Sequence, residues 1–176
     1  MASFAFMRPA RPLLPIVTVL LLNAGCTGYN HQVSLNETER SATPQEGTAS
    51  VDGSVSVKME KGDVANGAED FIYLIPVTPY STEWFEHVIV RGHTLRGQDP
   101  RGFRAVRRTV VGNDGRFQFT NIAAGDYFLS CTVSRGRPPV GIGRLAISRP
   151  SVERVDAYAL AAVKSGEAAH VVVTRP

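Results

Sequence analysis

Apolar and polar residues alternate on both sides of two closely spaced turns in the second half of the chain. The first turn lies at residues 113–115, whose Asn-Asp-Gly sequence tolerates a left-handed backbone. Phe117 and Phe119 follow at alternate positions, which is the period of a strand with one buried face. A second turn at residues 124–126 precedes another alternating stretch at residues 127–132. This succession of short strands and tight turns is typical of a β-sandwich.

The rest of the pattern predicts further strands. Valines alternate at residues 51–57, and the continuous apolar run at residues 71–77 fits a central strand covered on both faces. Alternation returns at residues 103–111, ahead of the first turn. Three more strands are expected at residues 142–147, 155–163 and 170–174. The alanines of residues 155–163 would also suit a helix, but the many Val, Tyr and Phe residues and the frequent turns favour an all-β domain.

Residues 78–104 break the alternation, and we call this stretch the insert. Its apolar side chains recur at the spacing of one helix face at Trp84, Phe85, Val88 and Ile89. We expect a short helix with Ser81 as its N-cap residue, and no capping box, because Trp84 occupies the third helical position. This helix should pack over one end of the sandwich and be followed by an irregular surface loop at residues 91–102.

Residues 1–25 have the layout of a signal peptide. Arg8 and Arg11 precede an apolar run at residues 13–22, which is too short to span a bilayer comfortably. The run ends in small residues, as a cleavage site does. We therefore expect that the protein is exported.

The end of this segment resembles the lipobox of bacterial lipoproteins. The match covers Ala24, Gly25 and Cys26, with Asn23 at the position where leucine is usual. The resemblance implies that the thiol of Cys26 carries acyl chains such as palmitate, which anchor the protein in the cell envelope, either facing the periplasm or in the outer membrane. Thr27 follows in place of an aspartate, which by similarity to enterobacterial sorting favours the outer membrane. The alternative is an ordinary signal peptide with an incidental cysteine.

Composition divides the remaining chain and restricts its partners. Residues 26–50 are polar and without periodicity, which is typical of a flexible linker that would hold the domain, residues 51–176, clear of the membrane. The chain has 19 basic and 16 acidic residues, and it becomes nearly neutral once the two leader arginines are removed. We therefore expect no nucleic-acid partner.

The chain has two cysteines, which are too few for a disulfide framework. Cys131 lies in a predicted strand and is expected to be a buried small hydrophobe. A disulfide between Cys26 and Cys131 would require that Cys26 is not lipidated.

Residues 114–129 carry the pattern Asp-Gly-Arg-Phe-x-Phe-x-x-Ile-x-x-Gly-x-Tyr-x-Leu, which resembles the carboxypeptidase regulatory-like domain. Residues 71–77 look like an early strand of that domain, and residues 165–173 look like its closing hairpin. The resemblance covers residues 51–77 and 104–174 and implies a prealbumin-like (transthyretin-like) β-sandwich of about seven or eight strands. Because the family serves as an accessory module, the resemblance implies a scaffold and no particular activity.

No pattern in the sequence matches a known catalytic site. The chain has four histidines, His31, His87, His93 and His170. None of them begins a zinc-protease motif, there is no Gly-x-Ser-x-Gly elbow, and the C-terminal tetrad of the prealbumin-like hydroxyisourate hydrolases is missing. We therefore expect no catalytic residue, metal or cofactor. The alternative is an enzyme or metal-binding protein that uses residues 78–104, where His87 and His93 could meet a carboxylate such as Glu83 or Glu86.

A cluster of arginines in and beside the insert offers a candidate contact surface. Its members are Arg91, Arg96, Arg101, Arg104, Arg107 and Arg108. Arg104 and Arg108 would share one face of a strand, with Arg107 on the other. Together with two aromatic residues, the candidate partner-binding set is Arg104, Arg107, Arg108, Tyr80 and Trp84. The alternatives are a solvated loop with an exposed sheet face, and aromatic rings that plug the end of the sandwich.

Together, these features predict a non-catalytic exported lipoprotein. Its β-sandwich would be an interaction or structural module at the bacterial cell envelope. The lipid on Cys26 would contact the membrane, and the partner would be an unidentified envelope protein or glycan.

Overall fold

The computed structural model describes residues 28–41, 46–60, 62–137, 141–142, 145–146 and 151–175. The strands are β1 (Gly28–Asn30), β2 (Ala49–Val55), β3 (Val57–Lys58), β4 (Val64–Ala65), β5 (Phe71–Pro76), β6 (Thr94–Arg96), β7 (Arg107–Val110), β8 (Arg116–Ile122), β9 (Gly125–Arg137), β10 (Gly141–Ile142), β11 (Leu145–Ala146), β12 (Ser151–Val163) and β13 (Ala168–Val173). The helical elements are α1 (Glu37–Ser41), α2 (Pro79–Trp84), the π-helical segment η1 (Phe85–Val90) and the 3₁₀ turn η2 (Pro100–Phe103).

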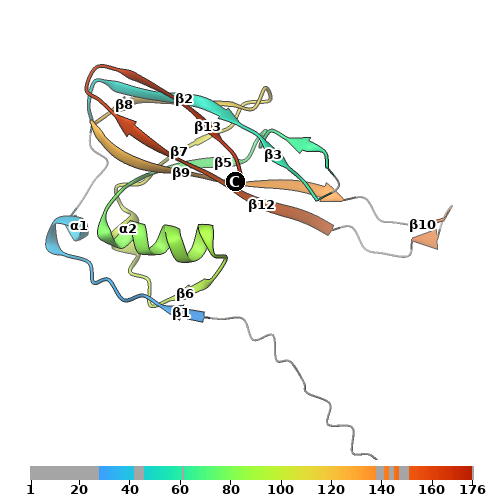
Figure 1. Cartoon of the computed structure of the whole chain (residues 1–176), viewed down its shortest axis with the longest axis horizontal. Coiled ribbons are helices and arrows are strands. Elements are labelled where there is room, and N and C mark those ends of the chain that lie inside the picture. The colour runs from blue at the N-terminus through green and yellow to red at the C-terminus, as the bar shows by residue number, and fades with distance from the viewer. Residues whose placement is uncertain are drawn as a thin grey trace, which may run out of the picture.

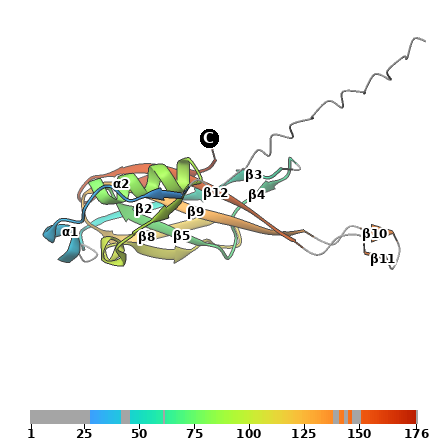
Figure 2. The ribbon, with the colours of Figure 1, turned by 90° about the horizontal axis from the view of Figure 1, so that it is seen from below.

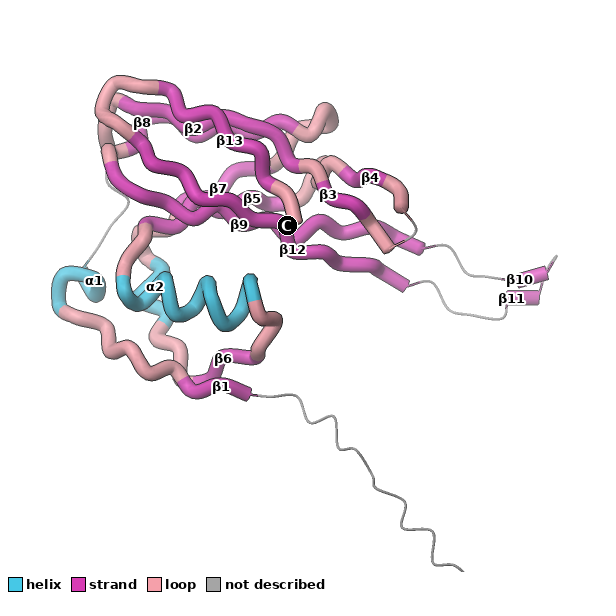
Figure 3. The backbone as a smooth tube through the Cα atoms, viewed as in Figure 1, coloured by secondary structure: helices cyan, strands magenta, loops and turns pink. Residues whose placement is uncertain are grey.

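Two β-sheets face each other and form the body of the molecule (Figures 1 and 3). One sheet has four antiparallel strands in the order β12-β9-β5-β7. The other has three strands in the order β13-β2-β8, with β13 parallel to β2. The main core lies between them, and its almost fully buried side chains include Val51, Val55, Ile72, Leu74, Leu129, Cys131 and Val173. The prediction of an all-β fold is confirmed.

The alternating stretch after the first turn forms β8 and β9, as predicted. Gly115 at that turn has a φ of +79°, a conformation that favours glycine. The N–H of Gly112 donates to the carbonyl of Arg116 at 2.8 Å and closes the turn. Phe117 and Phe119 are buried in the core, as their alternation indicates.

For two other predicted elements, the structure decides between strand and helix in one case and shifts the start of the strand in the other. Residues 155–163 lie in β12, so the helix alternative is wrong. The strand predicted at residues 103–111 begins only at Arg107, because the chain before it forms turns: the N–H of Val106 donates to the carbonyl of Phe103, the last residue of η2.

The C-terminal part differs from the expected closing hairpin. β12 and β13 belong to different sheets, so residues 165–173 and the strand before them do not form a paired hairpin. Among the described residues, the ladder contact between the two segments is a bridge from Tyr158 to Thr174. The strand expected at residues 142–147 falls partly outside the described residues, which show β10 paired with β11 there.

A third layer covers the outer face of the four-stranded sheet, where α2 and η1 run as one continuous coil (Figures 1 and 2). Phe85 stacks on Phe128 of β9 with ring centroids 4.1 Å apart, and its ring meets Tyr158 of β12 edge-on at 5.3 Å. Ile75 of β5 is buried in the same cluster. The predicted helix is confirmed, but it packs on the face of a sheet rather than over the end of the sandwich.

The helix begins with a capping box that the sequence analysis missed. Thr78 is the N-cap residue: its Oγ1 accepts from the N–H of Ser81 at 3.1 Å, and Oγ of Ser81 accepts from the N–H of Thr78 at 2.9 Å. Ser81 is therefore the third helical residue, and its prediction as N-cap is wrong. Pro79 takes the first helical position, where its missing N–H leaves no bond unmade.

Residues 28–41 form an ordered strap along the insert, which differs from the flexible linker expected over residues 26–50. β1 pairs in parallel with β6, and Oδ1 of Asn36 accepts from the N–H of Glu39 at 2.8 Å at the start of α1. Leu35 and Glu39 are buried. Composition misses this segment because polar contacts with the insert hold it, and such contacts leave no apolar periodicity.

Gly53 generates a prediction about the contact between β2 and β13. A Cβ atom at this position would lie 1.8 Å from the carbonyl oxygen of Val171, so Gly53→Ala must push two paired strands apart. We expect the free energy of unfolding to fall by at least about 2 kcal/mol in urea denaturation. Gly136→Ala is the matched control, because a Cβ there meets nothing within 4 Å. Equal stability of the two variants would contradict the close approach of β2 and β13 at Gly53.

Candidate functional site

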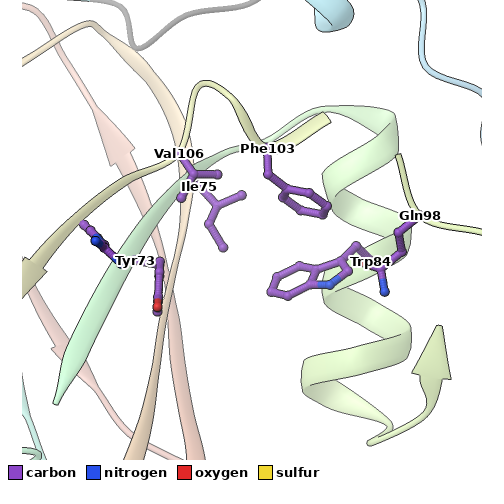
Figure 4. Close-up of a pocket in the computed structure, with 7 residues that line it drawn as sticks. Tyr73, Ile75, Trp84, Gln98, Phe103 and Val106 are labelled. Atoms are coloured by element: carbon purple, nitrogen blue, oxygen red, sulfur yellow. The ribbon is translucent and has the colours of Figure 1, made fainter. Parts of the chain in front are cut away.

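A hollow of about 490 Å³ opens on the outer face of the four-stranded sheet, beside α2 (Figure 4). We call it the aromatic pocket. Its lining residues are Tyr73, Ile75, Trp84, Gln98, Phe103, Val106 and Arg108. They come from β5 and β7, from the last residue of α2, and from the chain between β6 and β7.

The aromatic rings of the pocket are held by their neighbours. Trp84 and Phe103 meet edge to face with ring centroids 5.3 Å apart, and Phe103 also meets Tyr80 edge-on at 5.7 Å. Figure 4 shows Trp84 and Phe103 across the pocket from Tyr73 and Ile75 of the sheet. Ile75 is 3% exposed, whereas Tyr73 is 37% exposed. The pocket therefore has an apolar floor and open aromatic walls.

Two polar side chains complete the pocket. Arg108 lies opposite Tyr73 in the register of β5 and β7, and its guanidinium carbon is 4.8 Å from the centre of the Phe71 ring. Nε2 of Gln98 donates to the carbonyl of Leu95 at 2.9 Å, which fixes the amide at the pocket. The described lining offers donors and aromatic faces, but it contains no carboxylate, histidine or cysteine.

The predicted partner-binding residues separate in the structure. Trp84 and Arg108 both line the aromatic pocket. Arg107 lines a different hollow of about 260 Å³, where its Nη1 donates to the carbonyl of Asn121 at 2.9 Å. Arg104 is exposed at the end of η2 and lines neither of these hollows.

Tyr80 was predicted to bind a partner, but the structure buries it. Its side chain is 2% exposed and stacks on His31 of the strap at 4.0 Å, so its ring is covered within the chain. Its place between the strap and the insert also differs from the alternative in which the aromatic rings plug the end of the sandwich. Its role is to join the strap to the insert.

Sequence reasoning missed five lining residues: Tyr73, Ile75, Gln98, Phe103 and Val106. A signal existed for the first two. They alternate with core residues in the apolar run of β5, and the second apolar face of such a strand must be covered by something. The other three come from the irregular end of the insert, where no periodicity identifies an inward face.

A buried carboxylate joins the strap to the insert. Oε1 of Glu83 accepts from the N–H of Gln32 at 2.7 Å, and Oε2 accepts from the N–H of Val33 at 2.8 Å. Nδ1 of His31 lies 2.6 Å from Oε2, an ion-pair distance, although neither ring nitrogen of His31 makes a regular hydrogen bond with the described residues. We call this arrangement the Glu83 latch.

The surroundings of Glu83 favour its charged form. Burial by itself would raise its pKa, but the N–H groups of Val33 and Gln32, followed by His31 and Tyr29, outweigh that effect, so the pKa of Glu83 is lowered. The pKa of the Tyr29 phenol is raised, first by desolvation and then by the negative charge of Glu83.

The histidines of the insert meet each other rather than Glu83. Nδ1 of His87 is 3.3 Å from Nδ1 of His93, and Tyr29 stacks on His87 at 3.5 Å. Within the part of the chain that the structure describes, no three His, Cys, Asp or Glu residues form a group that could hold a metal ion. His170 instead pairs with Asp52 at 2.7 Å on the three-stranded sheet.

Of the two cysteines, the structure describes only Cys131. Cys131 is buried, as predicted, and desolvation, followed by the charges of Asp70 and Asp156, raises its pKa to about 12. Its thiol is therefore unreactive at neutral pH. Cys26 lies outside the described residues. None of the described helices has the length and apolar character needed to cross a membrane.

Comparisons with known proteins bear on the fold. No protein-family model matches the chain, and no curated protein matches it. Among solved structures, a "putative carbohydrate binding protein" from Pseudomonas aeruginosa is similar with a TM-score of 0.63, over 81% of this chain and 99% of that one. The two sequences are 22% identical, so the similarity concerns the fold.

The Glu83 latch predicts that Glu83→Gln releases the strap. The N–H groups of Gln32 and Val33 would lose a charged acceptor, so their hydrogen exchange should accelerate about tenfold or more. Glu86→Gln is the matched control, because Glu86 is exposed and pairs with Arg91. Equal exchange in both variants would show that the carboxylate does not hold the strap.

Acid should open the same latch in the wild type. Because the folded-state pKa of Glu83 lies below its ordinary value of 4.5, the latch is complete above about pH 4.5 and is lost as the pH falls through the folded-state pKa. Exchange at Gln32 and Val33, corrected for its intrinsic pH dependence, should therefore rise below pH 4.5. The Glu83→Gln variant should lack this step.

Proposed function

We propose that this protein is a non-catalytic carbohydrate-binding module at the bacterial cell envelope. The aromatic pocket is the observation that carries the proposal. A sugar ring presents apolar C–H faces, which pack against flat aromatic rings, and a rim of hydroxyl groups that need hydrogen-bond partners. Trp84, Phe103 and Tyr73 supply the rings, and Gln98 and Arg108 supply polar groups at the same hollow.

The size and chemistry of the pocket support binding rather than turnover. Its volume of about 490 Å³ is within the range of roughly 300–1,000 Å³ that is usual for small-ligand sites. Glycoside hydrolysis generally uses two carboxyl groups that flank the scissile bond. The described lining of the aromatic pocket includes none. The name of the similar structure from Pseudomonas aeruginosa is in keeping with a carbohydrate ligand.

The proposal includes the scaffold. We assign the domain to the carboxypeptidase regulatory-like, prealbumin-like sandwiches. The motif that suggests this family lies on β8 and β9, one in each of the two facing sheets. The insert, residues 78–104, adds the helix and loop that build the pocket on this scaffold.

Export and acylation of Cys26 complete the proposal. The strap begins at Gly28 and is fixed to the insert, so a lipid on Cys26 would hold the insert within a few residues of the bilayer. An extended residue spans about 3.5 Å. The module would then sit close to the membrane surface instead of at the end of a long tether.

Trp84 allows a direct test of carbohydrate binding. It is the single tryptophan of the chain and lines the pocket, so a bound sugar should change its fluorescence. We expect saturable changes with one of three probes: cellohexaose, chitohexaose or maltohexaose. Phe103→Ala keeps the reporter and removes one wall, so it should weaken binding about tenfold.

Leu160→Ala is the control for this titration, because Leu160 is an exposed apolar residue of β12 and is not among the lining residues. It should bind like the wild type. Equal loss in Phe103→Ala and Leu160→Ala would count against the pocket. A fluorescence that responds to none of a broad panel of oligosaccharides would count against carbohydrate binding.

Acylation is tested separately by labelling cells with palmitate. The wild-type protein should incorporate the label and fractionate with membranes, and globomycin should cause the unprocessed precursor to accumulate. Cys26→Ser should lose both properties, whereas Cys131→Ser should keep them. A soluble, unlabelled wild-type protein would disprove the anchor.

A further inference from the structure

Another hollow, of about 460 Å³, lies on the other side of the α2–η1 coil from the aromatic pocket. We call it the basic pocket. Three arginines line it: Arg91 at the end of η1, Arg154 on β12 and Arg175 beyond β13. We propose that the basic pocket binds an oxyanion, namely a phosphate or sulfate group.

The fold brings these arginines together from distant parts of the chain. Arg154, Asp156 and Tyr158 occupy alternate positions of β12 and line the pocket together, while Val155 and Ala157 between them are buried in the core. The N–H of Tyr158 donates to the carbonyl of Thr174 at 2.9 Å.

That bond fixes the C-terminal segment beside β12 and places Arg175 at the pocket. The α2–η1 coil supplies the third side, because Phe85 packs against the ring of Tyr158. All three walls are therefore tied to the core or to the coil.

The charge balance of the pocket is positive. Arg154 and Arg175 make no ion pair with the described residues, whereas Arg91 pairs with Glu86. The single carboxylate among the described lining residues is Asp156, and its Oδ1 already accepts from Oγ1 of Thr132 at 2.7 Å. Cations that share one hollow repel each other, and a bound anion would relieve that repulsion.

The donor chemistry favours an oxyanion with several acceptor oxygens. A guanidinium presents a planar fork of N–H groups that matches phosphate, sulfate and carboxylate oxygens. Guanidinium groups from three separate parts of the chain suit a tetrahedral group with three or more free oxygens better than a two-oxygen carboxylate. The partly exposed Tyr158 lines the same hollow and adds a hydroxyl donor.

The site is independent of the carbohydrate proposal, since the two pockets share no lining residue. The probe is inorganic pyrophosphate, titrated into the isotope-labelled full chain at constant ionic strength. Amide and arginine Nε–H resonances at Arg91, Arg154, Tyr158 and Arg175 should shift together and saturate. Shifts spread over surface arginines without saturation would overturn the site.

Two sets of variants should change the affinity for pyrophosphate in opposite directions. Arg154→Gln with Arg175→Gln should weaken pyrophosphate binding about tenfold or more, because two charged donors are lost. Asp156→Asn keeps an acceptor for Thr132 but removes the opposing charge, so it should bind pyrophosphate several times more tightly. Arg135→Gln is the control, since Arg135 is exposed, pairs with Asp63 and lines another hollow.

Each outcome decides the proposal. Weakening in the double variant, tightening in Asp156→Asn and no change in Arg135→Gln would support the basic pocket. Equal loss in Arg135→Gln, or weakening in Asp156→Asn, would overturn it. A second arm with glycerophosphoglycerol, a phosphodiester lipid headgroup without acyl chains, identifies the source. Tighter binding of pyrophosphate indicates a free phosphate or its monoester, and tighter binding of the diester indicates a lipid headgroup.

Discussion

The stacking of Phe85 on Phe128, at 4.1 Å, is the contact on which both pockets depend. It seats the α2–η1 coil on the outer face of the four-stranded sheet, together with Ile75 and Tyr158. The coil is narrower than the sheet, so it leaves a hollow on each side. One hollow lies over β5 and β7 and is aromatic, and the other lies over β12 and is basic. A single packed aromatic pair thus determines two surfaces of different chemistry.

The Glu83 latch shows how a short insert is made rigid from outside. Burying a carboxylate is costly unless hydrogen bonds and opposite charge compensate. Here two backbone N–H groups donate to the carboxylate and Nδ1 of His31 lies 2.6 Å from it, and all of these groups come from the strap. The carboxylate therefore selects one position of residues 28–41 along the insert. Trp84 follows Glu83 directly, so a fixed Glu83 also fixes one wall of the aromatic pocket.

The sequence pattern predicted those features of the fold that depend on residues close together along the chain. Strands β2, β5, β8, β9 and β12 were predicted because alternation along a few residues reflects the face they bury. The strap could not be predicted in this way, because its main partner, Glu83, is 51 positions from Gln32 along the chain. The N-cap was placed wrongly because Ser81 and Thr78 both carry a hydroxyl, and only the reciprocal hydrogen bonds show which residue begins the helix. Trp84 and Arg108 were identified by residue type, while Phe103 and Gln98 reach the pocket through tertiary packing alone.

The sequence of strand β5 indicates part of the aromatic pocket, because the strand is apolar on both faces. Its inward residues Ile72 and Leu74 are fully buried, and its outward residues Phe71, Tyr73 and Ile75 are also apolar. Their exposure falls from 44% to 37% to 3% along the strand, as the sheet passes from open surface, through the pocket, to beneath the coil. A strand that is apolar on both faces in an antiparallel sheet requires a further layer over its second face. Where that layer stops short of the end of the apolar run, the uncovered aromatic residues form one wall of a pocket. The length of the apolar run relative to the covering helix therefore decides where a site of this kind can form.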